Sequence, residues 1–506
     1  MGFDFSSEER RKLGYRLIDH IDQYFSTLDN RAIQPSAEER AVAPTPLPLP
    51  ELGSDATQVL DDLCREMIDR GFHIPAANYF GLMNPTPTYM AVLAEALVSA
   101  LNPQLASLAR SQFASTLEAE TIGWVASRFG WHKATGVAPA APGAILCDGT
   151  FTSGGNEANF TALALAIARH FPNAIEDGIA TAGARPVFYA SAESHHSLEK
   201  SAGLLGLGRK ALRRIPVNGN LRLDTARLIL QIEADYACGF APFCIVATAG
   251  TTSSGAIDDL NALAAIASRY GLWLHVDGAY GAAAAFSDKY RGLLSGIERA
   301  DSITVDPHKW LSMPFAAGII LTRHPAMLER AFSVASPYMP PVERPALIDN
   351  FKIGAQWSRR MNSLKLWLTL RVHGRREYEE MIERQMQLAS LMRQWFENSV
   401  DFELAAPQTL PILNFRLRGV DEHEAEAAHQ TFIEEFNRDG RYWISRTHVR
   451  GESVLRMMII SYLSTAEHLA GLQEALQSAA RQVMLRTAAE RVALQSAPQP
   501  FAPFTL

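Results

Sequence analysis

The feature that most constrains this fold is an alternation of two patterns between residues 88 and 362. Short apolar runs rich in β-branched residues take turns with alanine-rich stretches of helical periodicity. This alternation is typical of a mostly parallel sheet with helices on both faces, an α/β fold. The last run, AGIILTR, should be a return strand. The predicted strands lie in GAILCDG (143–149), PVFYAS (186–191), FCIVATAG (243–250), LWLHVDGAY (272–280), SITVDPH (302–308) and AGIILTR (317–323).

The segments that flank this alternation predict two further domains. Residues 1–87 combine a serine-capped helical pattern with a proline-rich linker, so we expect an N-terminal helical arm that packs on the main body or on a second subunit. Residues 363–506 show strand, helix, strand and helix patterns, which predict a small C-terminal α+β domain. Residues 88–362 would form the large domain, and 506 residues exceed one ordinary core.

Composition narrows the class of protein. A net charge of -7 argues against binding to nucleic acid or an anionic membrane, and no apolar stretch is long enough to span a bilayer. Four cysteines without a CxxC pair indicate reduced thiols in a cytoplasmic protein. His195 and His196 have no third ligand at metal spacing, and neither HExxH nor GxSxG occurs, so we predict no metal and no serine hydrolase.

An acid and a lysine follow two of the predicted strands. Asp277 ends one strand, and Lys309 follows the next, within VDPHKW (305–310). Ligands bind beyond the carboxyl ends of parallel strands, so both side chains should face one cleft without needing to touch. Taken singly, Asp277 could cap a turn and Lys309 could reach solvent.

Three other strand ends carry polar residues. The segment TSGGNEANFTAL (152–163) exposes backbone N–H groups at a helix start, which attracts phosphate, although a plain capped helix would read the same way. His195 follows a strand and could stack on a flat ligand or move a proton. Thr252 lies in a polar turn after another strand.

The order of these features indicates one ligand. A phosphate loop, a stacking histidine, a threonine turn, an acid and a lysine at successive strand ends fit pyridoxal 5'-phosphate. This cofactor uses a lysine as its Schiff-base partner and an acid to keep its ring nitrogen protonated. A lysine held in this way need not be buried as a free ammonium.

The motifs HVDGAYG (275–281) and DPHKW (306–310), at this separation, resemble those of the group II pyridoxal-phosphate-dependent amino-acid decarboxylases, the relatives of aromatic-L-amino-acid decarboxylase. The resemblance runs from residue 78 to residue 374 and continues more weakly to the end. It implies the PLP-dependent transferase fold type I, and a homodimer with its active site at the interface.

The resemblance also implies roles for single residues. Lys309 would form the Schiff base, Asp277 would pair with the ring nitrogen, and Ala279 and His195 would pack on the two faces of the ring. Tyr338, on a loop after the lysine, matches a tyrosine implicated in protonating the product, and it favours simple decarboxylation because aldehyde-forming relatives often have phenylalanine there. An ordinary exposed tyrosine is the alternative. The remaining cofactor contacts would be Gly155, Asn156, His308 and Thr252.

Some residues depart from the family pattern or leave a choice open. Asp306 stands where asparagine is common, which weakens the expectation of a phosphate contact there. Ala316 and Ala317 replace an acid and a cysteine of many bacterial relatives and bear on substrate choice. Arg359 and Arg360 match an arginine pair near the family's site, but they could equally cap a helix or line an interface.

The predicted activity is decarboxylation of an L-amino acid to the amine and CO2. Phe80, Leu82 and Thr252 are expected to contact the substrate, and their apolar surroundings favour an aromatic amino acid. One alternative is an oxygen-dependent aldehyde synthase. Another is a non-catalytic homologue that binds pyridoxal phosphate, against which the intact set of Lys309, Asp277 and His195 argues.

Overall fold

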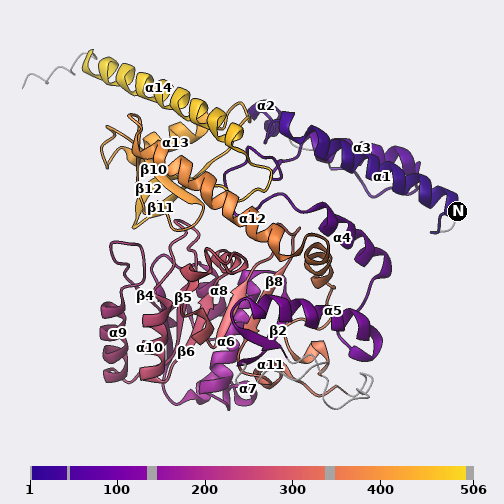
Figure 1. The fold of residues 1–506 in the computed structure, drawn as a ribbon, viewed down its shortest axis with the longest axis vertical. Coiled ribbons are helices and arrows are strands. Elements are labelled where there is room, and N and C mark those ends of the chain that lie inside the picture. The colour runs from indigo at the N-terminus through magenta and orange to yellow at the C-terminus, as the bar shows by residue number, and fades with distance from the viewer. Residues whose placement is uncertain (1–2, 43–45, 134–144, 337–347, 497–506) are drawn as a thin grey trace, which may run out of the picture.

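The computed structural model describes residues 3–42, 46–133, 145–336 and 348–496. A large domain built on a central sheet occupies the lower part of Figure 1, and a second, smaller sheet with its own helices lies above it. The N-terminal helices project to one side of the body.

Within the described ranges, the central sheet has eight strands in the order β1-β2-β8-β7-β6-β5-β3-β4. All neighbouring strands are parallel except at β8, which runs antiparallel to both β2 and β7. This sheet confirms the predicted fold class and the return strand. The strands are β1 (Trp131–Lys133), β2 (Ile145–Thr152), β3 (Pro186–Ser191), β4 (Leu212–Ile215), β5 (Ala241–Thr248), β6 (Trp273–Asp277), β7 (Ser302–Val305) and β8 (Gly318–Thr322).

Both faces of the central sheet are buried, which explains why its strands read as continuous apolar runs. On β5, Ile245 and Ala247 join one core, whereas Cys244 and Val246 join the core on the opposite face. Helices α5 (Leu108–Ser127), α9 (Thr225–Ala237) and α10 (Leu260–Tyr270) contribute to the first core. Helices α6 (Gly155–His170), α8 (Ser197–Leu204) and α11 (Met327–Phe332) contribute to the second.

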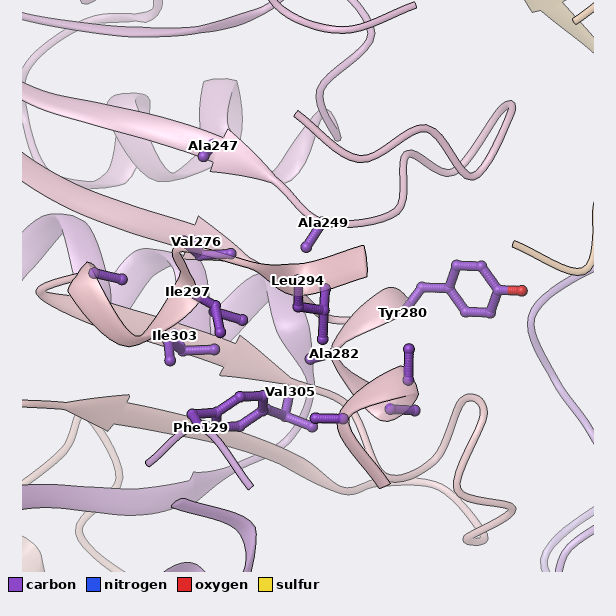
Figure 2. Close-up of a cluster of buried hydrophobic side chains, with 14 of the residues drawn as sticks. Phe129, Ala247, Ala249, Val276, Tyr280, Ala282, Leu294, Ile297, Ile303 and Val305 are labelled. Atoms are coloured by element: carbon purple, nitrogen blue, oxygen red, sulfur yellow. The ribbon is translucent and has the colours of Figure 1, made fainter. Parts of the chain in front are cut away.

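Figure 2 shows part of the first core. Val276 of β6 and Ile303 and Val305 of β7 lie in it beside Phe129 and Ile297. These strands end at the side of the sheet where Tyr280 is drawn. The core therefore fixes where the polar residues at the strand ends lie.

The small sheet is antiparallel, with the order β11-β12-β10-β9. Its core contains Phe396, Phe402, Phe415 and Phe432. The sequence patterns identified β10 and β12 but missed β9 and β11. The elements are α12 (Ser363–Glu397), β9 (Phe402–Leu404), β10 (Ile412–Leu417), α13 (Ala425–Phe436), β11 (Ser445–Val449), β12 (Glu452–Met458) and α14 (Ala466–Ser496).

The N-terminal helices are largely exposed. Helix α1 (Ser7–Thr27) begins with a capping box between Ser6 and Glu9, and it is bonded to α3 (Ala56–Asp69) through Asp61, which pairs with Arg16 and lies 2.9 Å from His20. Neither α1 nor α3 has a buried residue.

The other described helices are α2 (Ala37–Ala41), α4 (Tyr89–Leu101) and α7 (Ala174–Asp177). Short 3-10 segments span Leu28–Asn30, Ile179–Ala182, Arg209–Ala211, Gly281–Phe286, Arg291–Leu294, Ile297–Arg299 and Asn350–Lys352.

Candidate active site

A cavity of about 330 Å³ lies at the carboxyl ends of the central strands. The loops after β2, β3, β5, β6 and β7 each contribute to its lining. Parallel strands bring their carboxyl ends to the same edge, so residues far apart in the chain meet there. The cavity brings together eight residues that the sequence predicted for the site, namely Gly155, Asn156, His195, Thr252, Asp277, Ala279, His308 and Lys309.

At the start of α6, Gly154 and Gly155 leave the backbone uncovered by side chains. No side chain caps this helix, so its first backbone N–H groups are available to an anion. A Cβ atom added at Gly155 would lie 2.8 Å from Oδ2 of Asp306 and 3.1 Å from Cβ of Ala279. A larger residue at position 155 would have to displace Asp306 or Ala279, whereas glycine leaves the backbone N–H groups at the start of α6 uncovered.

Asp277 is the last residue of β6, and it is buried. Its Oδ2 accepts a hydrogen bond of 2.8 Å from Nδ2 of Asn159, and its Oδ1 accepts one of 3.2 Å from the backbone N–H of Ala279. Two donors from different elements thus hold the carboxylate in one orientation toward the cavity.

Lys309 pairs with Asp306, because its Nζ lies 3.2 Å from Oδ2 of that residue. The side chain of Asp306 is 2% exposed, and its Oδ1 has no hydrogen-bond partner among the residues that the structure describes. A buried carboxylate oxygen without a partner is costly, so this end of the cavity is prepared for a polar ligand.

Two histidines face the cavity, and both are held as neutral rings. Burial lowers the pKa of His195 and that of His308. Nδ1 of His195 accepts from the backbone N–H of Ser197 at 3.1 Å, and Nδ1 of His308 accepts from that of Ala317 at 3.0 Å. Each neutral ring therefore carries its proton on Nε2. His196 is exposed, so only one histidine of the pair can serve the site.

The turn that carries Thr252 is held by the small domain. Nη1 of Arg456 donates to the carbonyl of Thr252 at 2.8 Å, and Nδ2 of Asn414 donates to the carbonyl of Ser253 at 2.9 Å. Both donors stand on strands of the small sheet, and sequence reasoning did not identify either. An arginine inside an otherwise apolar strand, VLRMM, was the signal available for Arg456.

The structure corrects the expectation for Phe80, whereas the expectation for Leu82 stays a prediction. Phe80 is buried in the core of the small domain, where its backbone bonds to Trp443 and Met458. Leu82 is exposed, and neither residue lines the cavity. Phe315, which sequence reasoning missed, does line it. Tyr338 lies outside the described residues.

Arg359 does not line the cavity either. It is buried, pairs with Glu118 and donates to Oγ1 of Thr150 at 3.0 Å, so it joins α5 to β2. Arg360 pairs with Glu95 on α4 at 2.7 Å. A larger hollow of about 690 Å³ lies between α4 and α12, away from the strand ends, and is lined by none of the predicted site residues.

The fold and the cavity define an enzyme of the class that holds a flat, phosphorylated cofactor through a lysine at the strand ends. The residues fit pyridoxal phosphate, because an open helix start, a lysine, a fixed carboxylate and a neutral imidazole surround one cavity. Among the residues that the structure describes, no cluster of histidine, cysteine, aspartate or glutamate could hold a metal ion.

A family model described as the pyridoxal-dependent decarboxylase conserved domain matches residues 39–418, and the chain belongs to this family. It is a pyridoxal-phosphate-dependent decarboxylase. The aromatic-L-amino-acid decarboxylase of Bacillus atrophaeus is 29% identical over 486 residues, which cover 95% of this chain and 97% of that protein.

Two solved structures share the fold over nearly the whole chain. Catharanthus roseus tryptophan decarboxylase in complex with L-tryptophan has a TM-score of 0.83 at 25% identity, covering 95% of this chain and 100% of that one. Oryza sativa TDC with PLP and tryptamine has a TM-score of 0.86 at 24% identity, covering 96% and 100%.

Proposed function

We propose that this enzyme decarboxylates an aromatic L-amino acid and releases the amine and CO2. The observation that carries the proposal is the similarity to aromatic-L-amino-acid and tryptophan decarboxylases along almost the full length of both chains. The cavity supports it, because Lys309 is the one lysine or arginine among the described lining residues. An acidic substrate side chain would need a further cation.

The proposed roles are those that the family resemblance implies, and they are supported by the presence of these residues around one cavity. Lys309 would hold the cofactor covalently, Asp277 would face its ring nitrogen, and Ala279 and His195 would enclose its ring. The phosphate contacts would come from Gly155, Asn156 and His308. When bound, pyridoxal phosphate supplies the sink for the electron pair that the departing carboxylate leaves behind.

The protein's own groups manage position and protons. His195 offers an Nε2–H group toward the cavity while its Nδ1 stays bonded to the chain. Thr252, held by Arg456, would contact both cofactor and substrate. Tyr338 would deliver the proton to the α-carbon of the product. A tyrosine hydroxyl can act as a general acid at such a carbon.

The aromatic substrate would meet Phe315. This side chain lines the cavity and is 61% exposed, so it stands at the cavity's mouth, and its ring centroid lies 4.7 Å from that of His308. An exposed phenylalanine at a polar cavity offers a surface on which an aromatic ring can stack.

We further propose a cytoplasmic homodimer. Val59, Leu63 and Met67 recur four residues apart on α3 and are exposed, and α4 exposes Leu97 and Leu101. Exposed apolar faces of this extent indicate a partner, for which a second copy is the simplest choice. Leu82 could then reach the site from that copy. All four cysteines are free, which suits a reducing compartment, and no described helix could cross a membrane.

A substrate panel tests the proposal. The cofactor-loaded enzyme is given L-tryptophan, L-phenylalanine, L-tyrosine, L-dopa, L-glutamate and L-aspartate, and kcat/KM is measured from released CO2. We expect at least one aromatic substrate to exceed both acidic ones by about 100-fold or more, because the described lining offers no lysine or arginine besides Lys309 to pair with an acidic side chain. Preference for an acidic substrate would overturn the proposed substrate class.

A further inference from the structure

Asn159 is a buried amide in a helix whose other buried residues, apart from Thr161, are glycine or apolar. It lies on α6, is 1% exposed, and uses both ends of its side chain. Its Nδ2 donates to Oδ2 of Asp277 at 2.8 Å and to Oγ of Ser197 at 3.0 Å. Its Oδ1 accepts from Oγ1 of Thr304 at 2.9 Å and lies 3.0 Å from Nε2 of His275.

Chemistry fixes which way this amide points. A carboxylate only accepts hydrogen bonds, so the end of Asn159 that faces Asp277 must be its NH2 group. Its carbonyl oxygen then faces His275, and that contact is favourable only if Nε2 of His275 carries a proton. Burial lowers the pKa of His275 to about 4, so the ring is neutral near pH 7 and its other nitrogen, Nδ1, is an acceptor.

A second set of donors orients His275 in turn. Nδ1 of His275 lies 2.9 Å from Oγ of Ser302, and the same oxygen accepts from Nε1 of Trp273 at 2.9 Å. Because an indole N–H can only donate, the hydroxyl hydrogen of Ser302 is free to point at His275. The hydrogen bonds therefore run in one direction from Trp273 through Ser302, His275 and Asn159 to Asp277. Aligned hydrogen bonds of this kind reinforce one another.

We propose that Asn159 is a positioning residue for the cofactor, acting through Asp277. With its own orientation locked by Thr304 and His275, it supplies the donor that aims the Asp277 carboxylate at the ring nitrogen. This inference rests on the assigned cofactor. It gives a chemical reason for a buried polar network on the core side of the carboxylate, at a place where a purely structural sheet would carry apolar residues.

Three variants test the role. Asn159→Leu keeps the approximate shape of the side chain and removes the donor, and Asp277→Asn removes the charge on which it acts. Ser197→Ala is the matched control, because it removes the other acceptor of the same amide and leaves the bond to Asp277. The dissociation constant of pyridoxal phosphate is measured by titrating each apoprotein, together with the visible spectrum of the bound cofactor and the thermal unfolding midpoint of the apoprotein.

We expect Asn159→Leu to weaken cofactor binding about tenfold or more and to alter the visible spectrum, and Ser197→Ala to change binding less than about threefold. In the Asp277→Asn background, the added Asn159→Leu should cost less than about threefold, because the two residues act as one unit. Equal costs in both backgrounds, or unchanged binding by Asn159→Leu, would overturn the inference. If the wild-type protein bound no pyridoxal phosphate, the cofactor assignment itself would fail instead.

Discussion

Arg456 donates a hydrogen bond of 2.8 Å from Nη1 to the backbone carbonyl of Thr252, and so joins the small sheet to a turn of the active site. The guanidinium is buried, and burial lowers its pKa to about 10. Among the described residues, no carboxylate pairs with it. Its Nε instead donates to Oγ of Ser445 at 3.0 Å. The arginine therefore stays charged near neutral pH and is satisfied by neutral oxygens, one of them in the active site.

Replacing Arg456 should loosen the Thr252 turn. We expect Arg456→Met to lower kcat/KM about tenfold, because the carbonyl of Thr252 loses a donor from a charged group. The control is Arg416→Met on β10, whose side chain is half-exposed and pairs with Glu403 on the surface. Steady-state kinetics of both variants give the comparison. If the two behaved alike, the contact with Thr252 would not matter for catalysis.

Removing Lys309 should remove the covalent hold on the cofactor. We expect Lys309→Ala to lack the visible absorbance of lysine-bound cofactor and to lose turnover by at least about 1,000-fold, since the nucleophilic amine is gone. The exposed Lys289 provides the control variant, Lys289→Ala. Spectra and rates together check this, and retained turnover by Lys309→Ala would refute its assignment.

Phe315 should govern the affinity for aromatic substrates. We expect Phe315→Ala to raise KM about tenfold with little change in kcat, because the contact with the substrate ring is made before and during the reaction alike. Phe315→Tyr keeps the ring and should stay within about twofold of the wild type. An unchanged KM in Phe315→Ala would show that the substrate ring does not contact Phe315.

His275 should make stability depend on pH in a defined direction. Burial lowers its pKa from 6.5 to about 4, so the unfolded chain binds this proton more readily and stability falls as pH drops from 6.5 toward 4. Protonation of this histidine in the unfolded chain lowers the free energy of unfolding by up to about 3 kcal/mol over this range. We expect the unfolding midpoint of His275→Gln to fall less between pH 7 and pH 5 than that of the wild type. The exposed His423→Gln should follow the wild type.

The residues at the strand ends could be predicted because each one ends or follows an apolar run that is recognisable as a strand. Each apolar run that ends in Asp277, or precedes His195 or Lys309, is a strand of the central sheet. The short strand β4 was missed because LRRI carries two arginines in four residues, which hides the apolar pattern.

Contacts between distant segments could not be predicted in the same way. The pairs Asn159–Asp277 and Thr252–Arg456 lie 118 and 204 residues apart and depend on how the layers pack. Phe80 was expected to contact the substrate, but its large apolar side chain is buried in the core of the small domain. Apolar side chains fit a pocket wall and a core equally well, so their sequence does not distinguish the two.

Tyr338 should decide the fate of the product. We expect Tyr338→Phe to divert product from amine toward aldehyde, because the phenol that would protonate the α-carbon is lost. The ratio of amine to aldehyde, measured for this variant and for the wild type under air, checks the expectation. An unchanged ratio would show that Tyr338 does not protonate the α-carbon.

The most direct test is to identify the products of the purified, pyridoxal-phosphate-loaded enzyme by mass spectrometry, with an aromatic L-amino acid under air. We expect the amine and CO2 in equal amounts, with no consumption of oxygen. Aldehyde and ammonia formed at the expense of oxygen would contradict the proposed decarboxylation to an amine, and would make the enzyme an aldehyde synthase.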